Sequence, residues 1–324
     1  MQGKDVSEQA AEAQVSAGVD VGKAWLDAHL LPLGESLRVA NDSQGIRQLK
    51  RWLLRREVRL VVVEATGKWH RELHRSLAAD AVPVAVLDPV RARAFARATG
   101  LIAKTDRLDA RMLASFAFLL RPPPTQPAPR VLEEIAELVV AREGAVAEQT
   151  ALKNRIADTR TAFLLDQLRR RLTEIAAHID ALAAEILRRI DADPVLARRY
   201  EILTSIPGFG AVLASTLIVR LPELGACSQK QIAALAGLAP VADESGARTG
   251  KRSVRGGRPD VRRAGFLAAL SAVRHNPDIK AFHQRLLANA KPSKLALIAA
   301  ARKLIALANS LIANDRTWTP TAQN

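Results

Sequence analysis

Four acidic residues have the types and spacing of a metal-dependent site that acts on phosphodiesters. Asp20 lies between two valines, and Glu64 directly follows the β-branched run Val61–Val63. Asp106 and Asp109 are three residues apart at an expected helix start, so both point to one face. Carboxylates gathered in one crevice repel one another unless a divalent cation binds them, and hard oxygen ligands select Mg²⁺ or Mn²⁺. Two such ions can clamp the attacking and leaving oxygens of a phosphodiester.

Each acid also has an ordinary structural explanation when it is considered alone. Asp106 and Asp109 suit a helix start because the helix dipole favours acidic side chains there, and Glu64 could be an incidental loop residue. Asp20 is harder to explain, because a carboxylate inside a β-branched strand needs a partner. Taken together and in this order, the four acids favour a nuclease-type site.

A basic, glycine-rich segment downstream has the composition of a phosphate-binding loop. Residues 237–246 are rich in small side chains, and cationic residues follow them up to an expected helix from Val261. We expect nucleic-acid contacts from Arg248, Lys251, Arg252, Arg255, Arg258, Arg262 and Arg263. A hydroxyl in this loop could attack phosphorus while the cations stabilise the developing charge. On chemistry alone, Ser245, Thr249 and Ser253 are equivalent candidates.

The segment Ile206-Pro207-Gly208-Phe209-Gly210 predicts a tight turn before an apolar helix. Such a turn exposes backbone N–H groups of Gly208 and Gly210 at a helix N-terminus, where a DNA phosphate can bind. It resembles a helix-hairpin-helix element, which holds DNA without reading its sequence. The alternative is a helix–helix turn with no ligand.

The composition agrees with a partner that carries phosphates. The chain has 324 residues, with 48 Lys and Arg against 33 Asp and Glu, a net charge of +15. Hydrophobic residues make up 48%, which excludes a mostly disordered chain. Aromatic residues make up only 4%, so a surface built mainly on base stacking is disfavoured. The excess of cations indicates contacts with a nucleic-acid backbone.

The elements that must position the acids alternate between strands and helices. The pattern predicts strands at 19–21, 25–30, 59–63 and 82–87, and helices at 41–56, at 68–79, from 90 and from 105. Such alternation is typical of an α/β layer with a central sheet, and ligands bind at the carboxyl ends of its strands.

The second half of the chain is expected to be helical. A Pro-rich linker at 122–130 precedes a helical spacer at 131–200, in which apolar residues from Leu164 to Ile190 recur every three or four positions. This seam predicts an antiparallel hairpin or a coiled coil between subunits, and the core of an ordinary bundle is about equally compatible. A helical domain at 201–314 and a polar tail at 315–324 follow.

The remaining features indicate a soluble, cytoplasmic protein. Cys227 is the only cysteine, and no Cys/His cluster has zinc-finger spacing. No run approaches the 18 or so apolar residues of a membrane span. Residues 1–16 are expected to be a disordered extension rather than a signal peptide.

Several of these motifs together resemble one protein family. Gly18-Val19-Asp20-Val21-Gly22-Lys23, Glu64-Ala65-Thr66-Gly67 and Lys104-Thr105-Asp106 with Asp109-Ala110 are similar to the DEDD motifs of the transposases of the insertion sequence 110 family. Ile206-Pro207-Gly208-Phe209-Gly210, Gly237-Leu238-Ala239-Pro240, Ser245-Gly246, Asn276-Pro277 and Ala301-Arg302-Lys303-Leu304 are similar to that family's C-terminal transposase domain. The resemblance covers nearly the whole chain after Ala17.

The resemblance implies a RuvC-like domain of the RNase H type at 17–121, a coiled-coil spacer, and a mainly helical transposase domain. It implies DNA recombination on donor and target duplexes, guided by a structured bridge RNA, in a dimer or tetramer of a prokaryotic cytoplasmic protein that associates with the nucleoid when active. Asp20, Glu64, Asp106 and Asp109 would bind Mg²⁺ or Mn²⁺, and Ser245 would be the nucleophile that links to a DNA phosphate. The extra N-terminal segment and a short, Arg-rich spacer at 157–171 depart from the family pattern.

Two other functions fit the same residues. A RuvC-like junction-resolving nuclease would use the four carboxylates without serine chemistry. A non-catalytic nucleic-acid-binding protein would use the basic loop alone, with structural acids. The DNA sequences that the protein joins are not encoded in the chain, because the family assigns that choice to the RNA.

Overall fold

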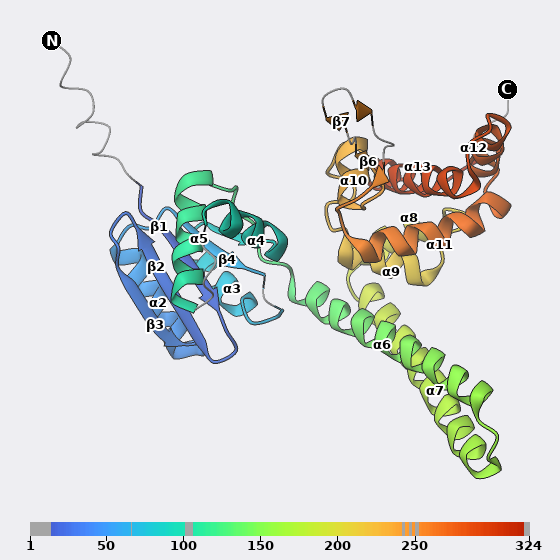
Figure 1. Ribbon diagram of the computed structural model, residues 1–324, viewed down its shortest axis with the longest axis horizontal. Coiled ribbons are helices and arrows are strands. Elements are labelled where there is room, and N and C mark those ends of the chain that lie inside the picture. Colours follow the sequence, from blue (N-terminus) through green and yellow to red (C-terminus); the bar gives the residue numbers. More distant parts are fainter. Residues whose placement is uncertain are drawn as a thin grey trace. The chain divides into compact units, whose positions relative to one another are not determined.

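The computed structural model describes residues 14–65, 67–100, 106–241, 244–245, 248–249 and 253–320, and for 106, 107, 244, 245, 248 and 249 it describes the backbone alone. The chain forms two compact units, Met1–Ala128 and Pro129–Asn324, whose boundary falls inside the Pro-rich segment (Figure 1). Most of the predicted N-terminal extension, residues 1–13, lies outside the described residues. The prediction was wrong at Ser16, which begins the first strand.

A mixed five-stranded sheet organises the first unit. Its strands are β1 (Ser16–Val21), β2 (Trp25–Leu31), β3 (Ser36–Ala40), β4 (Leu60–Glu64) and β5 (Val84–Leu87), in the order β3-β2-β1-β4-β5. The first three strands along the chain pair antiparallel, whereas β4 pairs in parallel with both β1 and β5. The α/β architecture predicted from the alternating pattern is confirmed, and β3 is an additional strand.

Helices cover both faces of this sheet. Successive side chains of each strand point to opposite faces, so the apolar strands bury side chains on each face. The odd-numbered Val61 and Val63 pack with α2 (Ser43–Arg55) and α3 (Arg71–Ala79). The even-numbered Leu60 and Val62 pack with α4 (Pro89–Ala98) and α5 (Asp106–Leu120). Asp42 caps α2, since its carboxylate accepts the N–H groups of residues 44 and 45 at 2.9 and 2.8 Å.

The closest contact between α5 and the sheet occurs at Gly18 in β1. A Cβ added at Gly18 would lie 2.1 Å from the backbone N of Ala114 and 2.2 Å from the carbonyl O of Ala110. Both atoms belong to helix backbone and cannot rotate away. Glycine is therefore required here for α5 to approach β1.

We expect Gly18→Ala to lower the free energy of unfolding by at least ~3 kcal/mol, because the added methyl group must separate α5 from the sheet. Gly144→Ala is the control: a Cβ there meets nothing within 4 Å, and Gly144 lies inside a helix. That control should be neutral or stabilising by about 0.5–1 kcal/mol. Urea titration of both variants checks the result, and parental stability of Gly18→Ala would contradict the packing argument.

A long helical hairpin begins the second unit. It consists of α6 (Arg130–Asp158) and α7 (Ala162–Asp191), which pack along each other (Figure 1). At its base, Arg189 pairs with Glu134 of α6 and with Glu185, which lies 2.7 Å away. Hydrogen bonds from Arg188 and Arg189 hold the pKa of Glu185 at about 2, far below its ordinary value.

The predicted apolar seam of α7 is buried only near the base of the hairpin. Ile179, Ile186 and Ile190 are buried, whereas Leu164, near the tip, keeps 49% of its surface exposed. Packing of α7 against α6 within one chain accounts for the buried apolar residues of the seam. A coiled coil between chains stays a prediction.

The other helices of this unit surround one apolar core. They are α8 (Pro194–Thr204), α9 (Ala211–Arg220), α10 (Gln229–Leu235), α11 (Pro259–His275), α12 (Pro277–Ala288) and α13 (Ser293–Ala313). By length and composition α13 could cross a membrane. Its residues Ala300, Ala301, Leu304 and Ile305 are fully buried in the core, as expected of the central helix of a folded unit.

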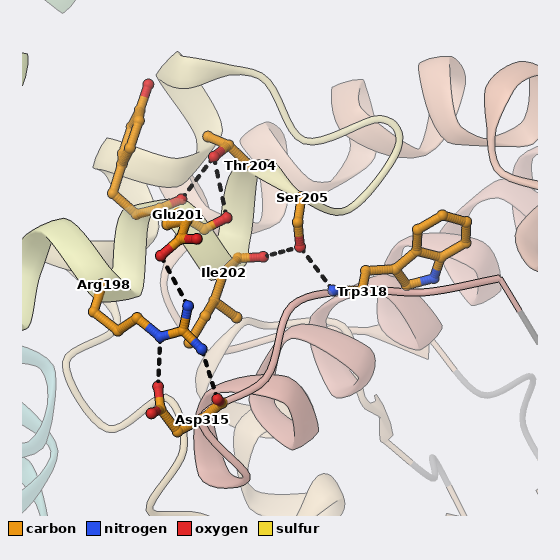
Figure 2. Close-up of polar contacts among 8 residues, drawn as sticks. Arg198, Glu201, Ile202, Thr204, Ser205, Asp315 and Trp318 are labelled. Carbon is orange, nitrogen blue, oxygen red and sulfur yellow. Dashed lines mark hydrogen bonds and ion pairs between the residues drawn. The ribbon is translucent and has the colours of Figure 1, made fainter.

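The chain end folds back onto α8 (Figure 2). Arg198 donates to the carboxylate and the carbonyl of Asp315 at 2.8 and 2.7 Å. The backbone N–H of Trp318 donates to the Ser205 hydroxyl at 2.8 Å, and that hydroxyl donates to the carbonyl of Ile202 at 2.7 Å. Asp315 and Trp318, predicted to be part of a polar tail, are thus held against α8.

Candidate nucleic-acid-processing sites

Two of the four predicted acids lie side by side at the carboxyl ends of parallel strands. Val19 of β1 is in register with Val63 of β4, so Asp20 and Glu64 follow them in adjacent positions. Both residues are half-buried. Asp20 lies two residues after Gly18, and Glu64 lies two residues after Val62. Because every second residue of a strand points to the same face, both acids lie on the sheet face that α4 and α5 cover.

The other two acids lie on the first turn of α5, close to where this helix crosses β1. Asp109 directly precedes Ala110, whose carbonyl faces Gly18, and Asp106 lies one helical turn earlier. Asp109 is half-buried, and the backbone alone is described for Asp106. The fold thus places Asp20 and Glu64 on the sheet face that α5 covers, with Asp109 and the backbone of Asp106 at the start of that helix. A site shared by the four acids stays a prediction.

These residues fit a hard divalent cation by the chemistry of their donors, since all four are carboxylates. Within the described part of the chain, no three Asp, Glu, His or Cys side chains lie close enough together to hold a metal ion. The side chain of Asp106 is outside that description. Metal binding by this set therefore stays a prediction.

A fifth acid on the same face was missed in the sequence. Asp27 of β2 is in register with Asp20 and is 5% exposed. Arg38 of β3 holds its carboxylate through Nε at 2.8 Å and Nη2 at 2.8 Å. This bidentate pair places a cation next to the acids and offsets the charge of Asp27.

His29 lies two residues after Asp27 on β2, on the same face of the sheet, and its pKa is shifted. It is in register with Gly18, and its Nδ1 lies 2.8 Å from the Ser36 hydroxyl oxygen. Burial, followed by the charge of Arg111 on α5, lowers the pKa of His29 below its ordinary value of 6.5. Protonation is thus harder in the folded chain than in the unfolded chain.

We expect the first unit to lose stability as the pH falls below 6.5. A depressed histidine pKa stabilises the fold at pH values above 6.5, and this contribution is lost as the pH falls through the folded-state pKa. In His29→Gln the melting temperature should therefore fall less between pH 7.5 and pH 5.5 than in the parent. Equal falls would show that His29 does not contribute to the pH dependence.

An aromatic side chain with two cations lies in the loops that follow β1 and β4. Trp69 is 38% exposed, and the Nζ atoms of Lys23 and Lys68 lie 5.8 and 5.7 Å from the centre of its ring. The Asn41 side chain ties these loops together by donating to the carbonyls of Gly22 at 2.8 Å and Trp69 at 3.4 Å. Sequence reasoning missed this group, because Lys23 and Trp69 are far apart in the chain.

The predicted serine lies on a β-hairpin arm of the second unit. At the base of the arm, β6 (Pro240–Val241) pairs with β9 (Ser253–Val254), and further out β7 (Glu244–Ser245) pairs with β8 (Arg248–Thr249). The pairing sets Ser245 opposite Arg248 and Glu244 opposite Thr249. A serine and a cation from the predicted list are therefore brought together. Lys251 and Arg252 lie outside the described residues.

Two of the predicted phosphate-binding arginines hold the fold together. Arg258 donates to both carboxylate oxygens of Glu223 at 2.6 Å. Burial, the largest single effect, acts to raise the pKa of Glu223, but the hydrogen bonds from Arg258, a backbone hydrogen bond and the charge of Arg258 together hold the pKa below its ordinary value. Arg262 donates to the carbonyl of Gly256 at 2.8 Å. Arg255 and Arg263 are exposed.

The two glycines of the predicted phosphate-binding turn differ in their surroundings. Gly208 has a φ of +102°, and a Cβ there would lie 2.6 Å from the Cβ of Ala272 on α11. Close helix packing therefore explains Gly208 without a ligand. Gly210 is exposed at the N-cap of α9, with nothing within 4 Å of its added Cβ, so the first N–H groups of α9 are accessible there.

Comparisons with known proteins cover both units. Residues 17–169 match the model of DEDD transposases of the IS110 type, and residues 200–284 match the model described as transposase, IS116/IS110/IS902 family. The pilin gene-inverting protein of Moraxella bovis is 27% identical over 315 residues, 93% of this chain and 96% of the relative. An uncharacterized 43.6 kDa protein of insertion element IS110 from Streptomyces coelicolor is 29% identical over 192 residues, 58% of this chain and 44% of the relative. The two family models together match most of the chain, which belongs to the IS110 family of transposases.

Proposed function

We propose that this transposase cuts and rejoins donor and target DNA by combining the carboxylates of its first unit with a serine of its second unit. The observation that carries the proposal is the placement of Asp20 beside Glu64 at the carboxyl ends of β1 and β4, facing α5. The strand order β3-β2-β1-β4-β5, with three antiparallel strands followed by two parallel ones, supports a RuvC-like sheet of the RNase H type.

In this proposal the carboxylates of the first unit bind the metal ion. Asp20, Glu64 and Asp109, with Asp106, would hold Mg²⁺ or Mn²⁺. The ion, when bound, supplies a Lewis acid for the phosphodiester oxygens. The Arg38–Asp27 pair places a positive charge beside Asp20 and limits like-charge repulsion there.

Ser245 would carry out the covalent step. Its Oγ attacks a DNA phosphorus, forming an O–P bond as the bond from phosphorus to a deoxyribose oxygen breaks. The released hydroxyl receives a proton, and the serine loses one. Attack of a hydroxyl of the other DNA on that phosphorus reverses the exchange, rejoins the strands and frees the serine. Arg248, opposite Ser245, would stabilise the charge that develops on phosphorus.

The partners in this proposal are two DNA duplexes, a bridge RNA and further copies of the chain. The relatives named as pilin gene-inverting proteins favour a recombinase over a simple nuclease. The net charge of +15 favours binding to RNA as well as DNA. Phe163 and Leu164, 70% and 49% exposed near the hairpin tip, favour contact between copies through α6 and α7.

The experiment that tests this function starts with the nucleic acid that copurifies with the protein. Sequencing it should return one structured RNA, and the protein with that RNA should recombine matching donor and target DNA with Mg²⁺ but not with EDTA. Cleavage of branched DNA without strand exchange would support a junction-resolving nuclease instead. Binding without any strand cleavage would support the non-catalytic alternative.

A further inference from the structure

A groove lies beside the base of the hairpin arm in the second unit. One part, about 520 Å³ in volume, runs between the β6–β9 ribbon and the first half of α13, along Pro240, Val254 and Ile298. A second part, about 400 Å³, shares Leu238, Val254, Lys294 and Ile298 with the first and continues to the start of α11. We call both together the arm groove. Each part is within the ~300–1,000 Å³ typical of ligand sites.

The charged residues that line the arm groove are cationic. Lys294 and Arg302 of α13 and Arg262 and Arg263 of α11 line it, and none of the described lining residues is acidic. Both helices begin at the groove, because Pro259 and Lys294 belong to their first turns. Cations and the positive ends of two helix dipoles favour an anionic ligand.

The floor of the arm groove is apolar and includes an aromatic ring. Phe266 of α11 is half-buried and lines the second part with Leu238 and Ile298. A phosphate alone would make no favourable contact with this apolar floor, and an apolar peptide would make no favourable contact with the cations. A nucleotide matches both features, since the flat π-face of its base can stack on an aromatic ring and its phosphates are anionic.

We propose that the arm groove takes an unpaired base of the DNA substrate, which stacks on Phe266 while the flanking phosphates contact Lys294 and Arg263. This inference rests on the proposed function, because the groove adjoins the arm that carries Ser245. A base removed from its stack would hold the neighbouring phosphodiester near that arm. The groove is thus a positioning site for DNA.

The test measures the affinity of the full chain for DNA by fluorescence anisotropy, in a Ser245→Ala background so that no covalent link can form. The probes are a labelled duplex with a three-nucleotide bulge and a fully paired duplex of equal length. We expect tighter binding of the bulged duplex and an approximately tenfold loss of that preference in Phe266→Ala, the effect of removing one base–aromatic stack. Phe266→Trp should retain the preference.

Phe282→Ala is the matched control, because Phe282 is also half-buried and flanked by cations, Arg285 and Lys303, but does not line the groove. An equal preference for the bulged duplex in Phe266→Ala and Phe282→Ala would overturn the inference. Should Phe266→Ala fail to fold, Lys294→Gln at an exposed position replaces it, and it should reduce the salt dependence of bulge binding by about one unit of the logarithmic slope. An unchanged slope would overturn the inference.

The outcome separates this inference from the proposed function. Loss of bulge preference in Phe266→Ala supports the groove even if the parent forms no covalent adduct with DNA. Adduct formation by the parent without any bulge preference would overturn the groove and leave the proposed function standing. A stronger preference for a bulged RNA duplex would overturn the assignment to DNA.

Discussion

Asp20→Asn and Glu64→Gln are each expected to lower the rate of DNA strand transfer by at least about a thousandfold, which corresponds to roughly 4 kcal/mol of transition-state stabilisation. Each change keeps the shape of the side chain but removes a charge at the edge where β1 and β4 end side by side. Measurement of recombinant product with Mg²⁺ or Mn²⁺ in excess checks the expected loss.

Binding and stability controls show whether that loss is chemical. Glu57→Gln changes an exposed acid in the turn before β4 of the same unit and should recombine at the parental rate. Both active-site variants should still bind DNA and RNA, because the cations are retained. Added Mg²⁺ or Mn²⁺ should raise the melting temperature of the parent but not of Asp20→Asn. Parental recombination by both variants would rule out a metal site at these residues.

Ser245→Ala is expected to abolish the covalent link to DNA and to reduce strand transfer by a factor on the order of 10⁶, as removal of a serine nucleophile does elsewhere. The reaction is stopped with denaturant on labelled DNA, and the nucleotide-linked peptide is mapped by mass. Ser245 pairs through its backbone with Arg248, so loss of its hydroxyl should leave the arm in place. The variant should therefore have the same melting temperature as the parent.

Thr249→Val and Ser253→Ala serve as the matched comparison, because both hydroxyls lie on the same arm. An adduct that persists in Ser245→Ala but disappears in one of them would move the nucleophile by a few residues and keep the mechanism. Active parent protein that yields no adduct at all would leave a carboxylate-only nuclease mechanism.

The sequence predicted the elements that carry strong local patterns. The β-branched run Val61–Val63 and the helical pattern at 41–56 stand out without knowledge of the fold, and β4 and α2 lie there. β3 was missed because it is a short edge strand in which Val39 alone is buried. Asp27 was missed with it, since its partner Arg38 lies on that strand.

The roles of the arginines could not be separated by sequence reasoning. Arg258 and Arg263 look alike in a basic stretch, yet Arg258 is paired with Glu223, 35 positions earlier in the chain, and Arg263 is 76% exposed. Likewise, Gly208 appears as a ligand-binding glycine until Ala272 of α11 is found against it. Contacts between distant segments decide these cases, and no local pattern encodes them.

The return of residues 315–320 to α8 has a consequence for synthesis of the protein on the ribosome. The first unit is contiguous and emerges before the second, whereas α13 and the segment that contacts Arg198 and Ser205 emerge after α8 to α12. Until α13 has emerged, the apolar faces of α11 and α12 lack their central partner. The unit that carries the serine arm can therefore be completed only after α13 and the segment up to Trp318 have left the ribosome, which delays activity until then.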